Sequence, residues 1–263
     1  MIQKYYDLNA ESCSIRCKLY CEDRAEIRSV ILFGHGFGGH KDNQAAQKFA
    51  ERVLSKNRGV ALITFNWPCH GDDIRKRLRL EDCDRYLSLL LTHITDAYGH
   101  WDPDSGTALP PTLFGYANSF GGYLFLKYVS EHGNPFAKIA LRSPAIDMYA
   151  VLTESVMEES DLERIRKGKT VSVGFDRKIE VDQPLLDSLR QADIRRRDYL
   201  VYADDIIIFH GTDDEIVPYA TVKRFAEDNV IEFVTVEGGD HRFLNQAKMH
   251  AVSEQIISFF QMK

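Results

Sequence analysis

The segment Gly115–Gly122 constrains the fold more than any other part of this sequence. The residues just before Ser119 form a short apolar run typical of a buried strand, and those after it have the apolar side typical of a helix. Ala117 and Gly121 lie two residues on either side of this serine. A strand that turns sharply into a helix needs small side chains at those positions, and it exposes the serine hydroxyl at the helix N-terminus. The pattern therefore predicts a strand–helix fold with Ser119 as a candidate nucleophile.

Strand-like and helix-like segments alternate from residue 29 onward, and the inner strands are continuous apolar runs, as expected for strands covered on both faces. Strand patterns occur at 4–9, 14–21, 29–33, 60–67, 112–117, 138–142, 205–210 and 231–237. Helical patterns outside the insertion occur at 43–56, 80–98, 122–129, 220–228 and 246–261. This order predicts a single α/β domain, residues 1–263, with a mostly parallel, doubly wound sheet and an N-terminal antiparallel hairpin.

The segment 147–203 interrupts this alternation. It is charged, carries short helical patterns at 152–167 and 184–195, and contains no fully apolar strand. An insertion after a sheet strand is well placed to cover an active site, because loops at that end of a sheet carry function. We expect a small lid or cap at about 147–203, and a peripheral decoration is the alternative.

Composition excludes several classes of protein. The chain has 44% hydrophobic and 27% charged residues and a net charge of −6, which disfavours a nucleic-acid surface. The basic run Arg195–Arg197 is flanked by Asp193 and Asp198 and reads as a solvated face. The N-terminus lacks the apolar core of a signal peptide, and no apolar stretch reaches the ~20 residues of a membrane span. We expect a cytoplasmic protein with a small-molecule substrate.

The five cysteines are an odd number, so they cannot all pair within one chain. Cys13, Cys17 and Cys21 recur every four residues, which on a strand places three thiols on one face. No fourth ligand accompanies them, so we expect free thiols in a reducing compartment and no metal.

An acid and a histidine follow the two strand patterns nearest the C-terminus. Asp213 and Asp214 come after the strand 206–209, and His241 follows the strand 231–236. A serine hydroxyl becomes nucleophilic when a base takes its proton and a third group orients that base. The order serine, acid, histidine is that of the α/β-hydrolases.

These segments resemble the α/β-hydrolase superfamily across nearly the whole chain, especially its cinnamoyl/feruloyl esterase and monoacylglycerol lipase-like (serine aminopeptidase-like) branch. The H-G-x-x-D-x-x-V-P motif at 210–218 implies that Asp214 is the catalytic acid, with Asp213 as its neighbour. The G-x-x-H motif at 238–241 implies that His241 is the base. Two departures, Ala117 for the first elbow glycine and Phe120 where many feruloyl esterases carry glutamine, weaken the expectation of a phenolic ester.

The loop Gly34–Gly39 looks like the oxyanion loop of the same superfamily. The resemblance implies that the backbone N–H groups of Phe37 and Phe120 form the oxyanion hole. The loop also spells G-x-G-x-x-G, a dinucleotide-binding pattern, but the next helix begins too late and the strand ending at Trp67 carries no acidic residue. We expect no nucleotide and no other cofactor.

The resemblance favours a serine esterase that cleaves carboxylic esters through an acyl-enzyme intermediate. Phe37, Met148 and Tyr149 adjoin the catalytic loops and are the candidate substrate-binding residues. One alternative is an aminopeptidase or acyl-peptidase that binds a substrate amine through acids of the insertion. Those acids are Glu154, Glu158, Glu159 and Asp161. Another alternative is a non-catalytic relative that binds a ligand or partner; the oligomeric state is left open.

Overall fold

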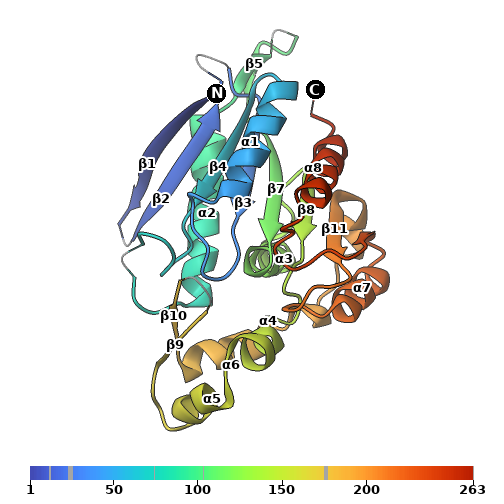
Figure 1. The fold of residues 1–263 in the computed structure, drawn as a ribbon. Helices are drawn as coiled ribbons and strands as arrows, with labels where there is room; N and C mark the ends of the chain where they lie inside the picture. The colour runs from blue at the N-terminus through green and yellow to red at the C-terminus, as the bar shows by residue number, and fades with distance from the viewer. Residues whose placement is uncertain (12, 23–25, 74, 103, 175–176, 263) are drawn as a thin grey trace.

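A computed structural model of the chain describes residues 1–11, 13–22, 26–73, 75–102, 104–174 and 177–262. Within these residues, its centre is a sheet of eight strands in the order β1-β2-β4-β3-β7-β8-β11-β12 (Figure 1). The strands are β1 (Ile2–Ala10), β2 (Cys13–Cys21), β3 (Ser29–Gly34), β4 (Val60–Phe65), β7 (Thr112–Asn118), β8 (Lys138–Arg142), β11 (Ile206–Gly211) and β12 (Glu232–Val236). β1 and β2 form an antiparallel hairpin, β2 is antiparallel to β4, and the remaining neighbours are parallel.

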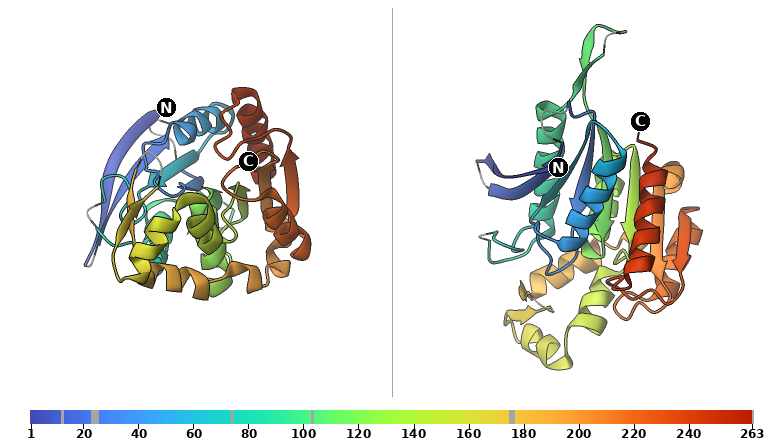
Figure 2. Two further views of the ribbon diagram at one scale, coloured as in Figure 1. Left: turned by 60° about the horizontal axis from the view of Figure 1, so that its bottom comes forward. Right: turned by 45° about the horizontal axis from the view of Figure 1, so that its top comes forward.

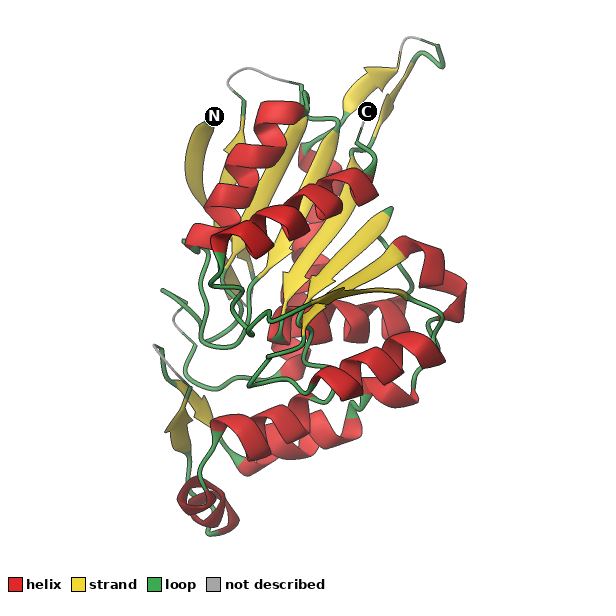
Figure 3. Ribbon diagram, turned by 45° about the vertical axis from the view of Figure 1, so that its right-hand side comes forward, coloured by secondary structure: helices red, strands yellow, loops and turns green. Residues whose placement is uncertain are grey.

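Helices cover both faces of this sheet (Figure 3). α1 (Gln44–Lys56) and α8 (Gln246–Phe260) pack on one face, in an apolar core separate from that of the other face. α2 (Leu80–Ala97), α3 (Phe120–His132) and α7 (Tyr219–Asp228) pack on the opposite face. The structure therefore confirms the predicted mostly parallel, doubly wound sheet with an N-terminal antiparallel hairpin.

The apolar runs explain why the central strands lie where they do. Every residue of β3, β4 and β11 is buried, because helices cover both sides of these strands. The face of α1 with Ala46, Phe49, Ala50 and Val53 is buried against the sheet. The Asn43 side chain caps this helix by accepting hydrogen bonds from the Ala45 and Ala46 amides.

The segment after β8 forms a separate layer at the end of the sheet where the parallel strands terminate (Figures 1 and 2). Its elements are α4 (Met148–Ala150), the π-helix η1 (Val151–Val156), α5 (Glu159–Arg166), β9 (Val171–Val173), β10 (Ile179–Val181), α6 (Gln183–Gln191) and the 3₁₀ helices η2 (Ile194–Arg196) and η3 (Leu200–Asp205). We call residues 148–205 the cap segment. Polar contacts join it to the core: among them, Arg79 pairs with Asp182 through both its terminal nitrogens, and the Tyr123 hydroxyl donates to the Ala192 carbonyl at 3.0 Å.

Some details differ from the sequence pattern. The predicted helix 152–167 is divided into η1 and α5, because Met157 and Glu158 adopt extended backbone angles between them. A small hairpin of β5 (His100–Asp102) and β6 (Thr107–Leu109) was not predicted, since its short strands are mostly exposed and have no apolar alternation. It projects from the end of the molecule opposite the cap segment (Figure 2).

Cys13, Cys17 and Cys21 lie on β2, and no disulfide joins any of the five cysteines, all of which the structure describes. Cys17 and Cys21 are buried, and Cys13 is half-buried. None of the helices in the described ranges combines the length and the apolar content that crossing a bilayer requires.

Candidate active site

Ser119 lies on a strained turn between β7 and α3. Its φ of 49° and ψ of −116° are unfavourable for a residue with a side chain, so the surrounding structure must hold it there. Its N–H donates to the Arg142 carbonyl at 3.1 Å, and its carbonyl accepts from Tyr123 and Ala145. A Cβ on Gly121 would lie 2.4 Å from the Gly34 carbonyl oxygen, so this position accommodates only glycine. The glycine two residues after Ser119 therefore permits the tight turn.

His241 and Asp214 meet Ser119 at the end of the sheet. The Ser119 hydroxyl donates to His241 Nε2 at 3.1 Å. His241 Nδ1 donates to both carboxylate oxygens of Asp214, at 2.9 and 3.0 Å. These partners assign the proton of the neutral imidazole to Nδ1 and leave the lone pair of Nε2 facing the serine. The structure thus brings together three side chains that are up to 122 residues apart in the chain.

The Asp214 side chain is fully shielded from solvent and held by backbone groups. Its Oδ1 accepts from the amides of Ile216 and Val217, at 3.0 and 2.8 Å. Burial raises the pKa of the Asp214 carboxyl, but the hydrogen bond and charge of His241 outweigh burial and hold the pKa below its ordinary value. The neighbouring Asp213 is exposed and accepts from the Thr212 hydroxyl. Asp214 is therefore the carboxylate that stays ionised beside His241.

A second imidazole lies behind Asp214, and the sequence analysis assigned it no role. His210 is fully buried, and its Nε2 lies 3.0 Å from the Val217 carbonyl oxygen and 3.3 Å from Asp214 Oδ2. Two acceptors around this nitrogen place its proton there. Burial lowers the pKa of His210 despite the nearby carboxylate, so the ring is neutral and acts as a hydrogen-bond donor.

The loop after β3 lies directly against Ser119. A Cβ on Gly36 would lie 3.2 Å from the Ser119 Cβ, so the backbone of this loop approaches the serine closely. Within the described part of the chain, the backbone N–H groups of Phe37 and Phe120 have no acceptor. His35 supports the loop: its Nδ1 donates to the Gly36 carbonyl at 2.8 Å, and its Nε2 accepts from the Trp67 amide. Two uncommitted donors therefore flank the serine.

A cavity of about 610 Å³ opens beside Ser119 and His241. Phe37 and Met148 line it, as expected, together with Val151 and Val156 of the cap segment. Tyr149 does not appear in the described cavity wall; its hydroxyl accepts a hydrogen bond from Arg190 at 2.6 Å. Successive residues of α4 point in different directions, so Met148 and Tyr149 cannot both face the serine.

Three of the acids that the sequence suggested for binding a substrate amine make contacts within or beside α5. Glu158 and Asp161 form a capping box at the start of α5, and Glu159 pairs with Arg166. None of the acids proposed to bind a substrate amine belongs to the described cavity wall. The one carboxylate in that described wall is Glu215, which accepts from the His241 amide at 3.2 Å.

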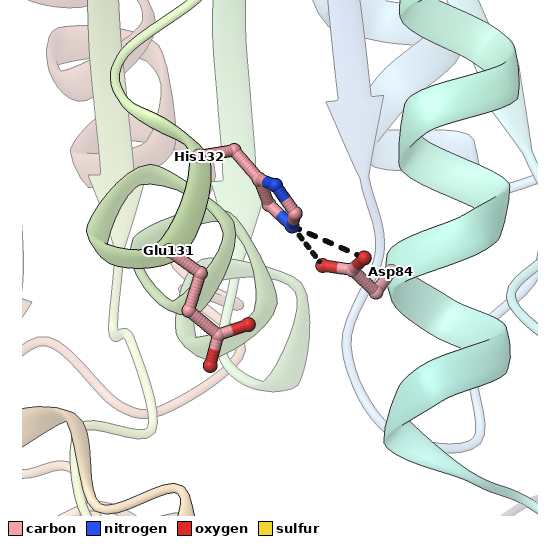
Figure 4. Close-up of side chains that lie close together, drawn as sticks. All are labelled: Asp84, Glu131 and His132. Atoms are coloured by element: carbon pink, nitrogen blue, oxygen red, sulfur yellow. Dashed lines mark hydrogen bonds and ion pairs between the residues drawn. The ribbon is translucent and has the colours of Figure 1, made fainter.

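A mixed cluster of Asp84, Glu131 and His132 lies between α2 and α3, away from the cavity (Figure 4). His132 Nε2 contacts both oxygens of Asp84, at 3.0 and 3.1 Å. Glu131 is paired with Lys127 one turn earlier on α3. The hydrogen bonds between His132 and Asp84 therefore link the two helices at the surface.

Two family models match this chain. The model described as "Serine aminopeptidase, S33" matches residues 25–173, which is more than half of the chain. The chain belongs to this family of α/β-hydrolases. A second model, described as the prolyl oligopeptidase family, matches residues 113–263. The two matched ranges overlap at 113–173, the part of this α/β-hydrolase that carries Ser119.

Solved structures share the fold of this α/β-hydrolase at low sequence identity. A putative hydrolase from Agrobacterium vitis is 17% identical, with a TM-score of 0.74 and coverage of 99% of each chain. Est1E from Butyrivibrio proteoclasticus, solved with ferulic acid, is 17% identical with a TM-score of 0.69, covering 96% of this chain and 98% of its own. A monoglyceride lipase variant from Saccharomyces cerevisiae is 15% identical with a TM-score of 0.68, covering 98% and 94%. No curated protein matches the sequence.

Proposed function

We propose that this α/β-hydrolase is a serine esterase that cleaves carboxylic esters without a metal or other cofactor. The observation that carries the proposal is the continuous chain of hydrogen bonds from Ser119 through His241 to Asp214 at the wall of the cavity. In this mechanism His241 takes the proton of Ser119 as the hydroxyl attacks the ester carbonyl. Asp214 keeps the imidazole in the required tautomer and stabilises its cationic form.

The backbone N–H groups of Phe37 and Phe120 stabilise the tetrahedral oxyanion in this proposal. Both are uncommitted, and the Phe120 amide also lies at the N-terminus of α3, where the helix dipole favours negative charge. The protonated His241 then donates to the leaving alcohol, which leaves an acyl-enzyme on Ser119. A water molecule activated by the same imidazole releases the acid.

The cap segment acts as a lid in this proposal. Met148, Val151 and Val156 supply apolar walls to the cavity, and Phe37 supplies a wall from the core. These side chains suit the apolar part of a small-molecule ester and exclude water from the reacting groups. Cysteines without disulfides support a reducing, cytoplasmic location.

The experiment combines covalent labelling with turnover. A fluorophosphonate probe is expected to modify the wild type at Ser119, which peptide mapping detects, and Ser119→Ala is expected to remove both the adduct and hydrolysis of p-nitrophenyl butyrate. Ser143→Ala is the matched control, because Ser143 is also buried at a strand end but does not line the cavity. An unlabelled Ser119 in a folded protein would refute the proposal and favour a ligand-binding role.

Amide hydrolysis is the second candidate, and the descriptions of both matching families favour it. The same triad and oxyanion donors serve amide and ester substrates. Comparing p-nitrophenyl butyrate with an aminoacyl p-nitroanilide separates the two activities. We expect the ester to be preferred; predominant cleavage of the anilide would assign the peptidase activity instead.

A further inference from the structure

A buried arginine in the cavity wall has no carboxylate partner. Arg142 ends β8, beside the end of β7 that carries the nucleophile, and is only 7% exposed. Among the described residues, no Asp or Glu side chain forms an ion pair with it. A buried cation without an opposite charge is unfavourable. The described residues therefore leave the charge of this guanidinium without an opposite charge.

Neutral groups hold the Arg142 guanidinium in one orientation. Its Nε donates to Asn118 Oδ1 at 3.2 Å, and its Nη1 donates to the Arg242 carbonyl at 2.7 Å. The Phe243 ring lies 5.3 Å from the guanidinium carbon, and the Met249 sulfur lies 3.9 Å from Nη1. Within the described residues, Nη2 has no hydrogen-bond acceptor. The guanidinium is thus fixed in place with donors left over.

The surroundings of Arg142 in the cavity carry further positive charge. Arg177 also lines it, and Glu215 is the one carboxylate in the described wall. Burial and the charge of Arg177 lower the pKa of His40, another lining residue. This excess of cations in a chain with a net charge of −6 indicates a local preference for a negative ligand.

Two helix N-termini add to this field. Asn43, the N-cap of α1, lines the cavity, and so does Leu244, immediately before the N-cap of α8. Lys48 of α1 hydrogen-bonds to Gln246 of α8 at 3.2 Å, so the first turns of these helices lie side by side. Helix N-termini carry a partial positive charge that favours anions.

We propose that Arg142 binds an anionic group of the substrate, so that the preferred esters carry a carboxylate or a phosphate a few bonds from the scissile carbonyl. The proposal rests on the proposed esterase function and names its substrate class. A guanidinium suits both groups because its parallel N–H donors match two oxygens of either anion. The apolar walls from the cap segment then accommodate the remainder of the substrate.

Paired esters test this preference. We compare 4-nitrophenyl hydrogen glutarate, which carries a free carboxylate, with its neutral methyl ester, and we measure kcat/KM for each. The wild type is expected to prefer the anionic ester at least tenfold, and added NaCl should reduce this ratio because it screens the charge interaction. Equal kcat/KM values for the two esters would overturn the proposal.

Arg142→Met supplies the mutational test, with the ratio of the two kcat/KM values as its readout. This variant should lose at least tenfold more on the anionic than on the neutral ester, and Arg142→Lys should retain part of the preference. Arg190→Met removes one exposed cation outside the cavity wall and should leave the ratio unchanged. An equal loss on both esters in Arg142→Met would assign the arginine a structural role and contradict the proposal.

Direct binding separates this proposal from the esterase mechanism. Calorimetry with the Ser119→Ala variant measures affinity for glutarate and for inorganic phosphate, which distinguishes the carboxylate from the phosphate source. Binding of either ion that is lost in the Ser119→Ala, Arg142→Met double variant supports the anion site even if neither ester is hydrolysed. If neither ion binds and both esters are hydrolysed at the same rate, the esterase function is supported and the anion site is refuted.

Discussion

Ser119 shows how a single residue depends on its neighbours. Its backbone angles are unfavourable. They persist because Gly121 packs so closely against the Gly34 carbonyl that a side chain at this position would not fit. The hydroxyl therefore points out of the turn toward His241, where a relaxed helix-starting serine would instead cap its own helix. The strained backbone of Ser119 therefore directs its hydroxyl oxygen toward His241.

Asp214→Asn tests the orientation of His241. The asparagine oxygen can keep the hydrogen bonds to the Ile216 and Val217 amides, because both use the same carboxylate oxygen in the wild type. Its NH₂ group would then face His241 Nδ1 and force the proton onto Nε2, which no longer accepts from Ser119. We expect ester kcat to fall by about 10³–10⁴-fold, measured with p-nitrophenyl butyrate.

The matched control for this prediction is Asp213→Asn, which changes the exposed neighbour and should leave kcat within about threefold, as for a surface change away from the reacting groups. A melting curve followed by circular dichroism checks that each variant is folded. Asp214→Asn activity above a tenth of the wild-type value would contradict the assigned role of Asp214.

The turn after β4 shows how one element supports another. His70 is buried between the loop Gly34–Gly39 and α3: its ring stacks on Phe120 with centroids 6.0 Å apart and contacts Phe37 edge-on at 5.7 Å. Its Nδ1 donates to the Pro68 carbonyl at 2.8 Å, and its Nε2 has no partner among the described residues. The turn thus packs against both residues whose amides we propose as the oxyanion hole.

Acid should destabilise this element through His70. Burial lowers the pKa of His70 to about 4, whereas an unfolded histidine titrates near pH ~6.5. Between these values the unfolded chain binds a proton that the folded chain does not, so the free energy of unfolding decreases as the pH falls. The contribution amounts to about 3 kcal/mol at pH values below 4, from about 1.4 kcal/mol per pKa unit.

Urea unfolding at several pH values measures this effect in the wild type and in His70→Phe, which keeps the ring stack and removes the titrating nitrogen. Between pH 7 and pH 4 the wild type should lose more stability than the variant, by up to the His70 contribution. Parallel pH dependences in the two proteins would show that His70 does not titrate in this way. Buried His35 remains in both proteins, and the variant removes only the part of its pKa lowering that the charge of His70 causes.

At the scale of the molecule, the cap segment and the core share one apolar cluster. Leu185 and Leu189 of α6 belong to the same buried cluster as Leu124 and Leu126 of α3. The Tyr199 hydroxyl donates to the Leu126 carbonyl at 3.1 Å, and Arg79 pairs with Asp182 across the boundary. The insertion therefore lacks a core of its own that would keep it folded apart from the sheet.

We expect the cap segment and the sheet to unfold together. Hydrogen–deuterium exchange at rising denaturant should give the same opening free energy for peptides from α6 and from β7, because the shared core makes their unfolding cooperative. The exposed β5–β6 hairpin is an internal control and should exchange without global unfolding. Exchange of α6 at clearly lower denaturant than β7 would identify the cap segment as an independent unit.

Local patterns in the sequence predict the layered fold and the order of the candidate catalytic residues along the chain. Continuous apolar runs predict β3, β4 and β11, because a strand covered on both faces must be apolar throughout. The small residues around Ser119 predict the sharp turn, since only they permit it. Motif position also distinguishes Asp214 from Asp213, which periodicity alone cannot do.

The tertiary structure decides which of these groups meet and what surrounds them. Arg142 is the last residue of β8, and its one local signal is a charge at the end of an apolar run. Its burial without a carboxylate partner among the described residues appears only when other elements pack around it. Met148 lines the cavity and Tyr149 does not, because the direction of a short helix depends on the chain that carries it. Proximity between distant residues is set by the packing of helices on the sheet, and no local pattern records it.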